Sequence, residues 1–585
     1  MNDLLPINGL TNLLDRTLAG ERLTEGDLTA LSAEERLWLI QRSPVRTKAH
    51  LIISSPDPVK LLKKLSPQEI YLTVKESWGT DAAVILELTS PDKIVQLMDM
   101  DIWKRDRIDF SKFMEWLQLL SEGGERVLIK SLLTLDEPLL ILFFKAIIEV
   151  TSRNLDQDPL EFSDEGWFSF DNLYYFRPID EEIDFDLVSN LLMRFFENEP
   201  DYYRVIMEGI MGELPSPMEE DAYQRRTSRM SMIGFPEVYE AKELFLFEDP
   251  NKIVQEIGSV SSKVIYIDEM QADQLPPHYW LIPRQSGGFF EDLMGEAADE
   301  AEVSHLFWEL SYLVHKVMAA SGLDFSDVNE LVSSAQTTKD YINLGLEYLA
   351  GVRHDEGKRI IREAYLVQLF RLGYTLAAAE RKRNEVLIKR LSEVIEPALW
   401  GDFARSVIFG LLDRKPLFYE GLTSGGQGYR NFRSPGDLAV AANFMADLSA
   451  RVNLVSEIVH IPDDVRPWLV RNAKICNWGL EHLFMTACVW ACLSGKWDVA
   501  PLSAEELIRF YDMVKEDPGI TDKVVRQVET FIRETAQNAD EKNKAAAVKF
   551  VRDTFTDFVQ ETMRLSGRED VDERFVSGVI TTTPS

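Results

Sequence analysis

The sequence predicts a mainly α-helical protein, and three observations lead to this fold class. Residues 32–101 contain a regular series of helix start signals. Apolar residues recur at three- and four-residue spacing along most of the 585-residue chain. Strand-like patterns are confined to short stretches in the middle. We therefore expect an N-terminal superhelix of short stacked helices, a small α+β middle segment with a β-hairpin, and a C-terminal helical domain.

We divide the chain into four parts: these three and a C-terminal tail. This number agrees with the three or four domains expected for a chain of this length at roughly 150 residues per domain. Residues 1–150 form an α-helical repeat domain, residues 151–295 a mixed α+β segment, and residues 296–565 an α-helical domain. Residues 566–585 are polar and end in Thr-Thr-Thr-Pro-Ser. We expect this tail to be disordered.

The helix starts in the first part follow one another at intervals of ten to fourteen residues. A Ser or Thr hydroxyl can accept a hydrogen bond from a free N–H of the first helical turn, and Pro fits the position after it. The predicted starts are Ser32, Ser43-Pro44, Ser55-Pro56, Ser66-Pro67, Thr80-Asp81 and Ser90-Pro91. Helices this short are marginal in water alone, so each must pack on its neighbours in an array.

Individual residues refine this prediction. Ser32 with Glu35, and Ser66 with Glu69, match the capping box, in which the acid bonds back to the N–H of the cap. Apolar residues at helical spacing follow each start and are expected to form the buried faces. They are Leu37, Ile40, Val59, Leu62, Ile70, Val74, Val84, Leu88, Ile94 and Met98.

The phrase Leu65-Ser66-Pro67-Gln68-Glu69 makes the first 130 or so residues resemble the N-terminal cytoplasmic domain of MgtE-type magnesium transporters. That domain is also a superhelix of short helices. The resemblance implies a further possible function, divalent-cation sensing by acidic faces within the first 190 residues. The membrane domain of those transporters has no counterpart in this sequence.

The middle segment predicts a hairpin and an acidic loop. Aromatic residues flank Asp171-Asn172 between Trp167 and Phe176, and Asp and Asn tolerate the positive φ of a tight turn. Asp156 and Asp158 lack the Gly and closing Glu of a calcium loop. The basic run Arg225–Arg229 is expected to pair with carboxylates of the protein itself, with anion binding as the alternative. Val264–Ile267 reads as a strand.

The amino-acid composition limits the classes of function that the protein can have. The chain carries 63 Lys and Arg against 97 Asp and Glu, a net charge of −34, which opposes binding to nucleic acid or to an anionic membrane surface. Its 3 Cys do not make a disulfide framework. We found no secretory signal and no apolar run of the roughly 18–20 residues that a membrane span needs. We therefore expect a soluble cytoplasmic protein, without membrane insertion, whose partner is another protein; the oligomeric state stays open.

Each catalytic motif that the sequence suggests lacks a required part. Val264–Glu269 looks like a Walker B strand, but Gly351…Gly357-Lys358-Arg359 has the wrong spacing and order for its Walker A loop. Gly421–Gly425 has Thr423 where an elbow nucleophile would stand, and further glycines around it favour a flexible loop.

The spacing of the Cys and His residues also argues against a metal site. At about 100° per residue, four helical residues point in different directions, so buried apolar thiols are expected instead of a zinc site. They are Cys476, His482, Cys488 and Cys492. His305 and His315 are too far apart along one helix to share a metal. We assign no catalytic residue and no metal ligand, and the cofactor stays unknown.

One constellation suggests a binding site for an anion. Arginine binds phosphate or carboxylate in bidentate fashion, and a glycine loop can present backbone N–H groups. The residues are Arg371, Arg430 and Arg433 with Gly425, Gly426 and Gly428. The alternative is that Arg371 pairs with a carboxylate of the core and that the loop is an ordinary one.

Four phrases together resemble the uncharacterised domain-of-unknown-function family 6178 of bacterial proteins. They are Phe170–Tyr174, Arg229 through Gly234-Phe235-Pro236 with Glu240-Ala241, Leu369–Tyr374, and Tyr429–Arg433. The resemblance implies a bacterial, mostly helical, cytoplasmic protein and supplies no catalytic residue.

The resulting functional hypothesis is a non-enzymatic helical interaction scaffold or regulatory subunit, because arrays of stacked helices offer long surfaces to partners. The first alternative is a small-molecule anion sensor or an enzyme that uses the arginine and glycine residues. The second is the divalent-cation sensor.

Overall fold

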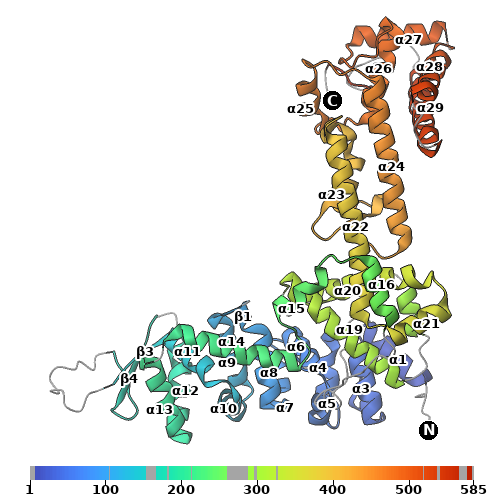
Figure 1. Ribbon diagram of the computed structural model, residues 1–585. Coiled ribbons are helices and arrows are strands. Elements are labelled where there is room, and N and C mark those ends of the chain that lie inside the picture. The colour runs from blue at the N-terminus through green and yellow to red at the C-terminus, as the bar shows by residue number, and fades with distance from the viewer. Residues whose placement is uncertain are drawn as a thin grey trace. The chain divides into compact units, whose positions relative to one another are not determined.

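The computed structural model confirms a mainly α-helical protein with three small two-stranded sheets among the described residues (Figure 1). The structure describes residues 7–104, 106–152, 166–180, 184–212, 214–259, 288–295, 300–323, 327–517, 519–535, 541–564, 576 and 578–582. The predicted strand Val264–Ile267 and the acidic residues Asp156 and Asp158 lie outside them.

The contacts of the chain divide it into two compact units, each assembled from three segments. Unit 1 comprises Met1–Leu246, Glu256–Lys339 and Arg353–Gln368. Unit 2 comprises Phe247–Gln255, Asp340–Val352 and Leu369–Ser585. The boundaries predicted from the sequence at residues 150, 295 and 565 stay a prediction.

Unit 1 begins with a row of short helices, coloured blue to cyan in Figure 1. They are α1 (Ile7–Leu18), α2 (Glu25–Thr29), α3 (Ala33–Arg42), α4 (Val45–Ile53), α5 (Pro58–Lys64), α6 (Pro67–Glu76), α7 (Ala82–Leu88), α8 (Pro91–Asp101), α9 (Phe110–Glu122), α10 (Glu125–Thr134) and α11 (Glu137–Ile147). Each of the six predicted starts is followed by a helix, α3 to α8, so the series predicted from the sequence is confirmed.

The caps explain most of these starts. Ser32 and Glu35 form the predicted capping box of α3, a motif of two reciprocal hydrogen bonds. Ser66 accepts a hydrogen bond from the N–H of Glu69 and caps α6. Helices α4 and α5 begin slightly later than their Ser-Pro signals, with Pro44 and Asp57 at the N-cap positions.

Two details of the predicted array are wrong. Glu69 does not bond back to Ser66; its carboxylate instead lies 2.9 Å from the ammonium of Lys48 in α4, and both side chains are buried. The stronger attraction of a buried cation redirects the acid from its local cap. Val59 and Val84 are 45% and 40% exposed, although their spacing placed them on the buried faces.

Basic side chains hold the carboxyl ends of the short helices. The ammonium of Lys93 in α8 donates to the carbonyls of Leu62, Lys63 and Leu65 at the end of α5, at 2.6–2.9 Å. Arg36 in α3 donates to the carbonyl of Leu31 at 2.5 Å, just after α2. These carbonyls have no partner within their own helix and carry the negative end of its dipole, so a cation there stabilises the stack.

The rest of unit 1 adds longer helices and two small sheets. The strands are β1 (Trp103–Lys104), β2 (Arg107–Ile108), β3 (Ile148–Ser152) and β4 (Tyr174–Pro178). The helices are α12 (Phe185–Asn198), α13 (Pro200–Gly212), α14 (Pro215–Met232), α15 (Val238–Lys242), η1 (Glu243–Phe245), α18 (Phe289–Gly295), α19 (Glu300–Ser321) and α21 (His354–Glu363). Three further helices have residues in both units: α16 (Pro250–Ser259), α20 (Val328–Ala350) and α22 (Leu366–Ser392).

The predicted hairpin turn is present, but its sheet is larger than expected. Asn172 has φ of 56°, and Phe168 and Phe176 exchange two backbone hydrogen bonds of 2.9 Å across the turn. The main partner of β4, however, is β3, which pairs with it in antiparallel register from Ile148↔Pro178 to Ser152↔Tyr174. The sequence signal therefore identified the turn and missed the more distant strand.

The basic run Arg225–Arg229 in α14 pairs with groups of the protein itself, as predicted. Arg229 makes two hydrogen bonds of 2.7 and 3.1 Å to the fully buried carboxylate of Asp99 and one of 2.5 Å to Asp136. Arg226 donates to the backbone carbonyl of Asp99 at 3.0 Å. These contacts fix α14 on α8 and on the start of α11.

Unit 2 consists of helices and one hairpin. Besides its parts of α16, α20 and α22, it contains η3 (Pro397–Trp400), α23 (Asp402–Leu412), β5 (Leu417–Tyr419), η4 (Glu420–Leu422), β6 (Tyr429–Asn431), α24 (Pro435–Ile458), α25 (Arg466–Ala473), α26 (Leu480–Ser494), α27 (Ala504–Glu516), α28 (Ile520–Thr535) and α29 (Glu541–Arg564). A capping box of Ser503 and Glu506 opens α27.

Part of the tail predicted to be disordered is ordered. Ile580 is fully buried, its N–H donates to the hydroxyl of Thr486 at 2.9 Å, and Thr581 forms a parallel bridge with Leu502. Polar composition alone suggested disorder. The short apolar segment Val579-Ile580 is buried beside α26, and this burial offsets the loss of chain entropy there.

Among the described residues, one helix, α24, is long and apolar enough to cross a membrane, and 33% of its most apolar window is buried. A single helix of this kind is weak support for a membrane span, because core helices of soluble proteins can have the same length and composition.

Candidate functional site

The candidate site lies where the β5–β6 hairpin leads into α24, in unit 2. Strands β5 and β6 pair in antiparallel register from Leu417↔Asn431 to Tyr419↔Tyr429, an element that the sequence analysis described only as a glycine-rich loop. Phe432 and Phe418 are fully buried, with ring centroids 5.7 Å apart. This contact anchors the hairpin and places Arg430 and Arg433 on either side of Phe432.

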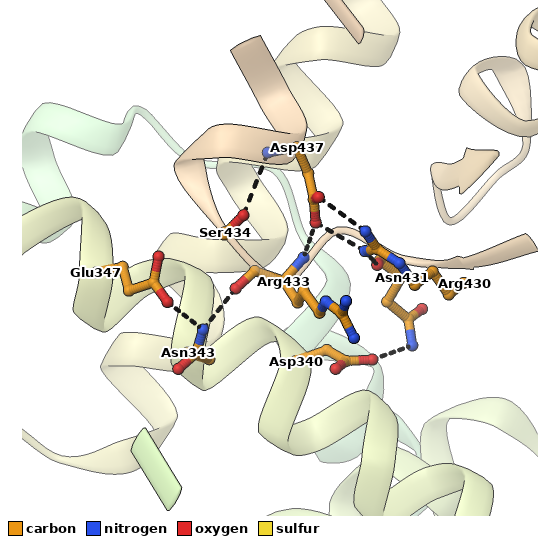
Figure 2. Close-up of polar contacts among 8 residues, drawn as sticks. All are labelled: Asp340, Asn343, Glu347, Arg430, Asn431, Arg433, Ser434 and Asp437. Atoms are coloured by element: carbon orange, nitrogen blue, oxygen red, sulfur yellow. Dashed lines mark hydrogen bonds and ion pairs between the residues drawn. The ribbon is translucent and has the colours of Figure 1, made fainter. Parts of the chain in front are cut away.

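Asp437 is the centre of the polar contacts (Figure 2). Its two carboxylate oxygens accept hydrogen bonds of 2.7 and 2.8 Å from the guanidinium of Arg430, and a third of 3.0 Å from the N–H of Arg433. Its own N–H donates to the hydroxyl of Ser434, the N-cap of α24. A carboxylate in the first turn also faces the positive end of the helix dipole.

Helix α20 supplies the other side of the site. The amide of Asn343 donates to the carboxylate of Glu347 and to the carbonyl of Arg433, both at 2.7 Å, and Asn431 donates to Asp340 at 3.1 Å (Figure 2). Burial raises the pKa of Glu347, and the nearby charge of Asp437 acts in the same direction. The hairpin, α24 and α20 are therefore joined by one network of side-chain and backbone hydrogen bonds.

Each of the other predicted groups lies next to a carboxylate of the protein itself. Arg371 forms an ion pair with Glu248. In the glycine loop, Gly425 has φ of 70°, and a Cβ built on Gly428 would lie 2.7 Å from the carboxylate of Glu420. The structure thus gives Arg371, Arg430 and the loop three different acidic neighbours: Glu248, Asp437 and Glu420.

Arg433 differs from the other two arginines. Within the part of the chain that the structure describes, the guanidinium of this half-buried residue makes no hydrogen bond and no ion pair, although its charge acts on the carboxyl group of Glu347 in α20. Its backbone, in contrast, is bonded on both sides, to Asp437 and Asn343. An external anion could use the guanidinium of Arg433 without breaking an existing ion pair, whereas at Arg430 it would have to displace Asp437.

Burial disfavours the thiolate form of two of the three cysteines. Cys488 is buried, and burial raises its pKa well above the ordinary value. Burial also raises the pKa of Cys492 to about 11. These thiols are protonated at neutral pH, and it is the thiolate that attacks or binds metal. Across the described ranges, no group of three or more His, Cys, Asp or Glu side chains is arranged to hold a metal ion.

Cation sensing by the acidic N-terminal part stays a prediction. Residues 153–165 and 181–183, which contribute many of its acids, are not among those the structure describes. His315, which the sequence analysis considered as a metal ligand, has a packing role. Its ring stacks on that of Phe235 with the ring centroids 3.9 Å apart, and burial lowers its pKa to about 4.

The nucleotide-binding and nucleophile motifs gain no support. The residues that look like a Walker B strand, Val264–Glu269, lie outside the described ranges. Gly357 lies inside α21, where an added Cβ would meet Leu293 at 2.6 Å, so this glycine serves helix packing. Thr423 follows strand β5 and the short turn η4, but no helix follows it as a nucleophile elbow requires.

Sequence reasoning missed the acidic half of the site. Asp437 was detectable as an acid three residues after the Ser434-Pro435 start signal, the same pattern that was read correctly at Ser32. Asp340, Asn343 and Glu347 carry no comparable signal, because only the fold brings α20 to the hairpin.

The four phrases of the family resemblance all have structural roles. Asp171 accepts two backbone hydrogen bonds in its turn, and Arg229 binds Asp99. In the third phrase Gly373 lies at a helix crossing, and in the fourth Arg430 binds Asp437.

Of the comparisons with known proteins, one gives a match. No curated protein and no solved structure matches the chain, so the likeness of its first part to MgtE-type transporters gains no support. A family model does match, over residues 25–582. Because this match covers nearly the whole chain, the protein belongs to the family of unknown function DUF6178.

Proposed function

We propose that this protein is a non-enzymatic scaffold or regulatory subunit that binds another protein through its N-terminal array of helices. The observation that carries the proposal is the way the array is built. Short helices α3 to α8, none longer than 11 residues, stack on one another instead of forming one long bundle. Arrays of this kind present an extended surface to which each helix contributes a few residues.

Charged contacts between helices make this surface stiff. Asp101 is buried at the end of α8 and accepts hydrogen bonds from Lys75 in α6 and from Lys112 and Trp116 in α9, at 2.7–3.0 Å. Lys48 and Glu69 join α4 to α6. A surface already rigid before binding loses less conformational entropy when a partner docks, which favours affinity.

Val59 and Val84 are two exposed apolar positions of the array at which the proposal can be tested. They lie on α5 and α7, two helices that contact each other. We would capture the tagged full-length chain from the lysate of its own cells and analyse it by native mass spectrometry. We expect a stoichiometric second protein bound to the chain.

Replacing Val59→Asp and Val84→Asp together should remove that protein while the circular dichroism spectrum stays the same. Val386→Asp, at a 74% exposed position in unit 2, is the matched control and should retain it. The proposal would be overturned if no second protein copurified with the wild-type chain, or if the partner bound equally to the double variant and to the control.

A second candidate function is an anion sensor, and the observation that favours it is the guanidinium of Arg433. It makes no ion pair to the residues that the structure describes and lies just before the N-terminus of α24. Phosphate should then raise the thermal unfolding midpoint of the wild type and not of Arg433→Gln. An equal response of both proteins would eliminate this candidate.

A further inference from the structure

Unit 1 contains a pocket where the β3–β4 sheet meets two helices. The end of α11, the start of β3, the end of β4 and the last turn of α13 line a cavity of about 670 Å³. Six of the ten lining residues are apolar and four are charged. Pockets that hold small molecules measure about 300–1,000 Å³ and combine apolar walls with a few polar groups, so this cavity has the size and composition of a ligand site.

The apolar wall of the pocket is open to solvent at two positions. Ile179, directly after β4, is 57% exposed, and Met211, in the last turn of α13, is 38% exposed. Because both line the same cavity, an apolar group bound there removes both side chains from water. The loss of exposed apolar surface favours binding.

The ammonium of Lys145 is the charged group that a ligand can use. Among the residues that the structure describes, it forms no ion pair, and its hydrogen bond goes to the carbonyl of Ile210 near the end of α13. An ammonium has three N–H donors, so two remain for a further acceptor. Lys145 is also half-buried, and a cation partly removed from water gains from a negative group beside it.

The other three charged residues of the pocket do not occupy Lys145. Arg177 donates to one oxygen of the Glu149 carboxylate at 2.7 and 2.9 Å, and its guanidinium lies 4.5 Å from the ring centroid of Trp167. These two charges compensate each other. Asp180 is exposed and makes no ion pair with Lys145. A carboxylate that reaches Lys145 therefore displaces no carboxylate of the protein.

We propose that this pocket binds a small molecule in which a carboxylate is joined to a short apolar chain, as in a fatty acid or an apolar amino acid. The carboxylate accepts hydrogen bonds from Lys145, and the chain packs on Ile179 and Met211. Charge-assisted hydrogen bonds of this kind are about twice as strong as neutral ones. The pocket lies on other elements than Val59 and Val84, and the inference does not depend on the proposed function.

Two alternatives make different predictions. If Lys145 serves only to cap the last carbonyls of α13, the pocket has no preference for a carboxylate. A cationic ligand would lie next to Lys145, and the nearest acid in the sequence, Glu149, is already paired with Arg177. Both alternatives are outcomes of the experiment.

The experiment measures the affinity of the full-length chain for three small molecules by isothermal titration calorimetry. Hexanoate and hexylamine have the same apolar chain with opposite charges, and norleucine carries both charged groups. We expect hexanoate and norleucine to bind, each at least about tenfold more tightly than hexylamine. The net charge of −34 favours the cation hexylamine in general, so the opposite preference identifies a local site. The tighter of the two carboxylates shows whether a fatty acid or an amino acid is the natural class of ligand.

Lys145→Met should weaken the binding of hexanoate at least about tenfold. Lys130→Met, at an exposed lysine of α10 outside the pocket, is the matched control and should bind like the wild type. The proposal is wrong if neither carboxylate binds the wild type, if hexylamine binds as tightly as hexanoate, or if Lys145→Met binds hexanoate unchanged.

A second variant does not touch the hydrogen bond to α13. Ile179→Glu places a carboxylate at an exposed position of the pocket and should also weaken the binding of hexanoate, with an unchanged circular dichroism spectrum. Tyr239→Glu, at an 83% exposed position outside the pocket, is its control. Equal binding by these two variants would contradict the pocket as the site. The double variant Val59→Asp and Val84→Asp should bind hexanoate like the wild type, so each proposal can fail without the other.

Discussion

The backbones of Gly373 in α22 and Tyr341 in α20 are in direct contact. A Cβ atom on Gly373 would overlap with the carbonyl group of Tyr341, and a Cβ atom on Gly345 would overlap with the carbonyl oxygen of Leu369. The two helices therefore cross with a glycine on each side. Tyr341 closes the crossing, with its ring 5.3 Å from that of Phe370 and 5.7 Å from that of Tyr374.

Gly373→Ala should destabilise unit 2, because the methyl group can be accommodated only if the two helices move apart. Overpacking of this kind costs about 1–3 kcal/mol, and a clash with backbone belongs at the upper end. Urea denaturation followed by circular dichroism would show a lower midpoint. Gly9→Ala is the control: no atom lies within 4 Å of its added Cβ, and we expect no loss of stability. Equal midpoints for the two variants would refute a close crossing.

Asp101 should make stability depend on pH in the acid range. Burial alone would raise its pKa, but the hydrogen bonds and charges of Lys112 and Lys75 outweigh burial, so the pKa is lowered. Because the folded pKa lies below the unfolded value, the stabilisation is complete above about pH 4 and is lost as the pH falls through the folded pKa.

We therefore expect Asp101→Asn to lose about 3–5 kcal/mol at pH 7, since two lysines lose their carboxylate. The difference from the wild type should shrink below about pH 4, where Asp101 of the wild type also becomes neutral. Unfolding midpoints measured from pH 7 to 2 check this. Asp201→Asn, whose side chain is 96% exposed, should behave like the wild type at every pH. A constant difference across the range would speak against the ion pairs.

Arg229 should be far more important for stability than its neighbour Arg225. Replacing Arg229 by Met leaves the fully buried Asp99 without its bidentate partner, which typically costs about 3–5 kcal/mol. Arg225 makes an exposed pair with Asp221, and Arg225→Met should cost less than about 1 kcal/mol. The thermal unfolding midpoints of the two variants, each compared with the wild type, measure these losses of stability. Similar losses would mean that the Asp99 pair contributes little.

Arg430 and Arg433 should separate a structural role from a binding role. Arg430→Met removes both guanidinium bonds to Asp437, and we expect a loss of about 3 kcal/mol. Arg433→Met keeps the backbone bonds of residue 433 and should change stability by less than about 0.5 kcal/mol. Denaturation midpoints without added anion measure both. If Arg433→Met were the more damaging change, its guanidinium would have a structural partner.

Local chemistry made the helical array predictable. A Ser or Thr cap, a Pro in the first turn and apolar residues at helical spacing act within about ten residues, so the starts of α3 to α8 could be read directly. The turn at Asp171-Asn172 was predictable for the same reason, because the tolerance of Asp and Asn for a positive φ is a property of their own side chains. The pairing of Arg225–Arg229 with the protein's own groups followed from the excess of acids.

Partners distant in the sequence were not predictable. Nothing near Glu69 indicated that Lys48 would take its carboxylate, and nothing near Arg430 indicated that its neighbourhood would include Asp340 and Asn343 from another helix. The exposed positions of Val59 and Val84 also depend on which neighbouring helices cover α5 and α7. A periodic pattern marks an apolar face but does not say whether another element covers it.

The sequence by itself determined where helices begin, that the protein is mainly α-helical, and that its surface is acidic. These properties follow from interactions within one turn and from composition. Only the tertiary structure decided which carboxylate each arginine contacts and which aromatic rings contact one another. The physical reason is that ion pairs and ring contacts require distances of a few ångströms between residues far apart in the sequence, such as Asp99 and Arg229, which are 130 positions apart. Such distances are set only when the helices pack.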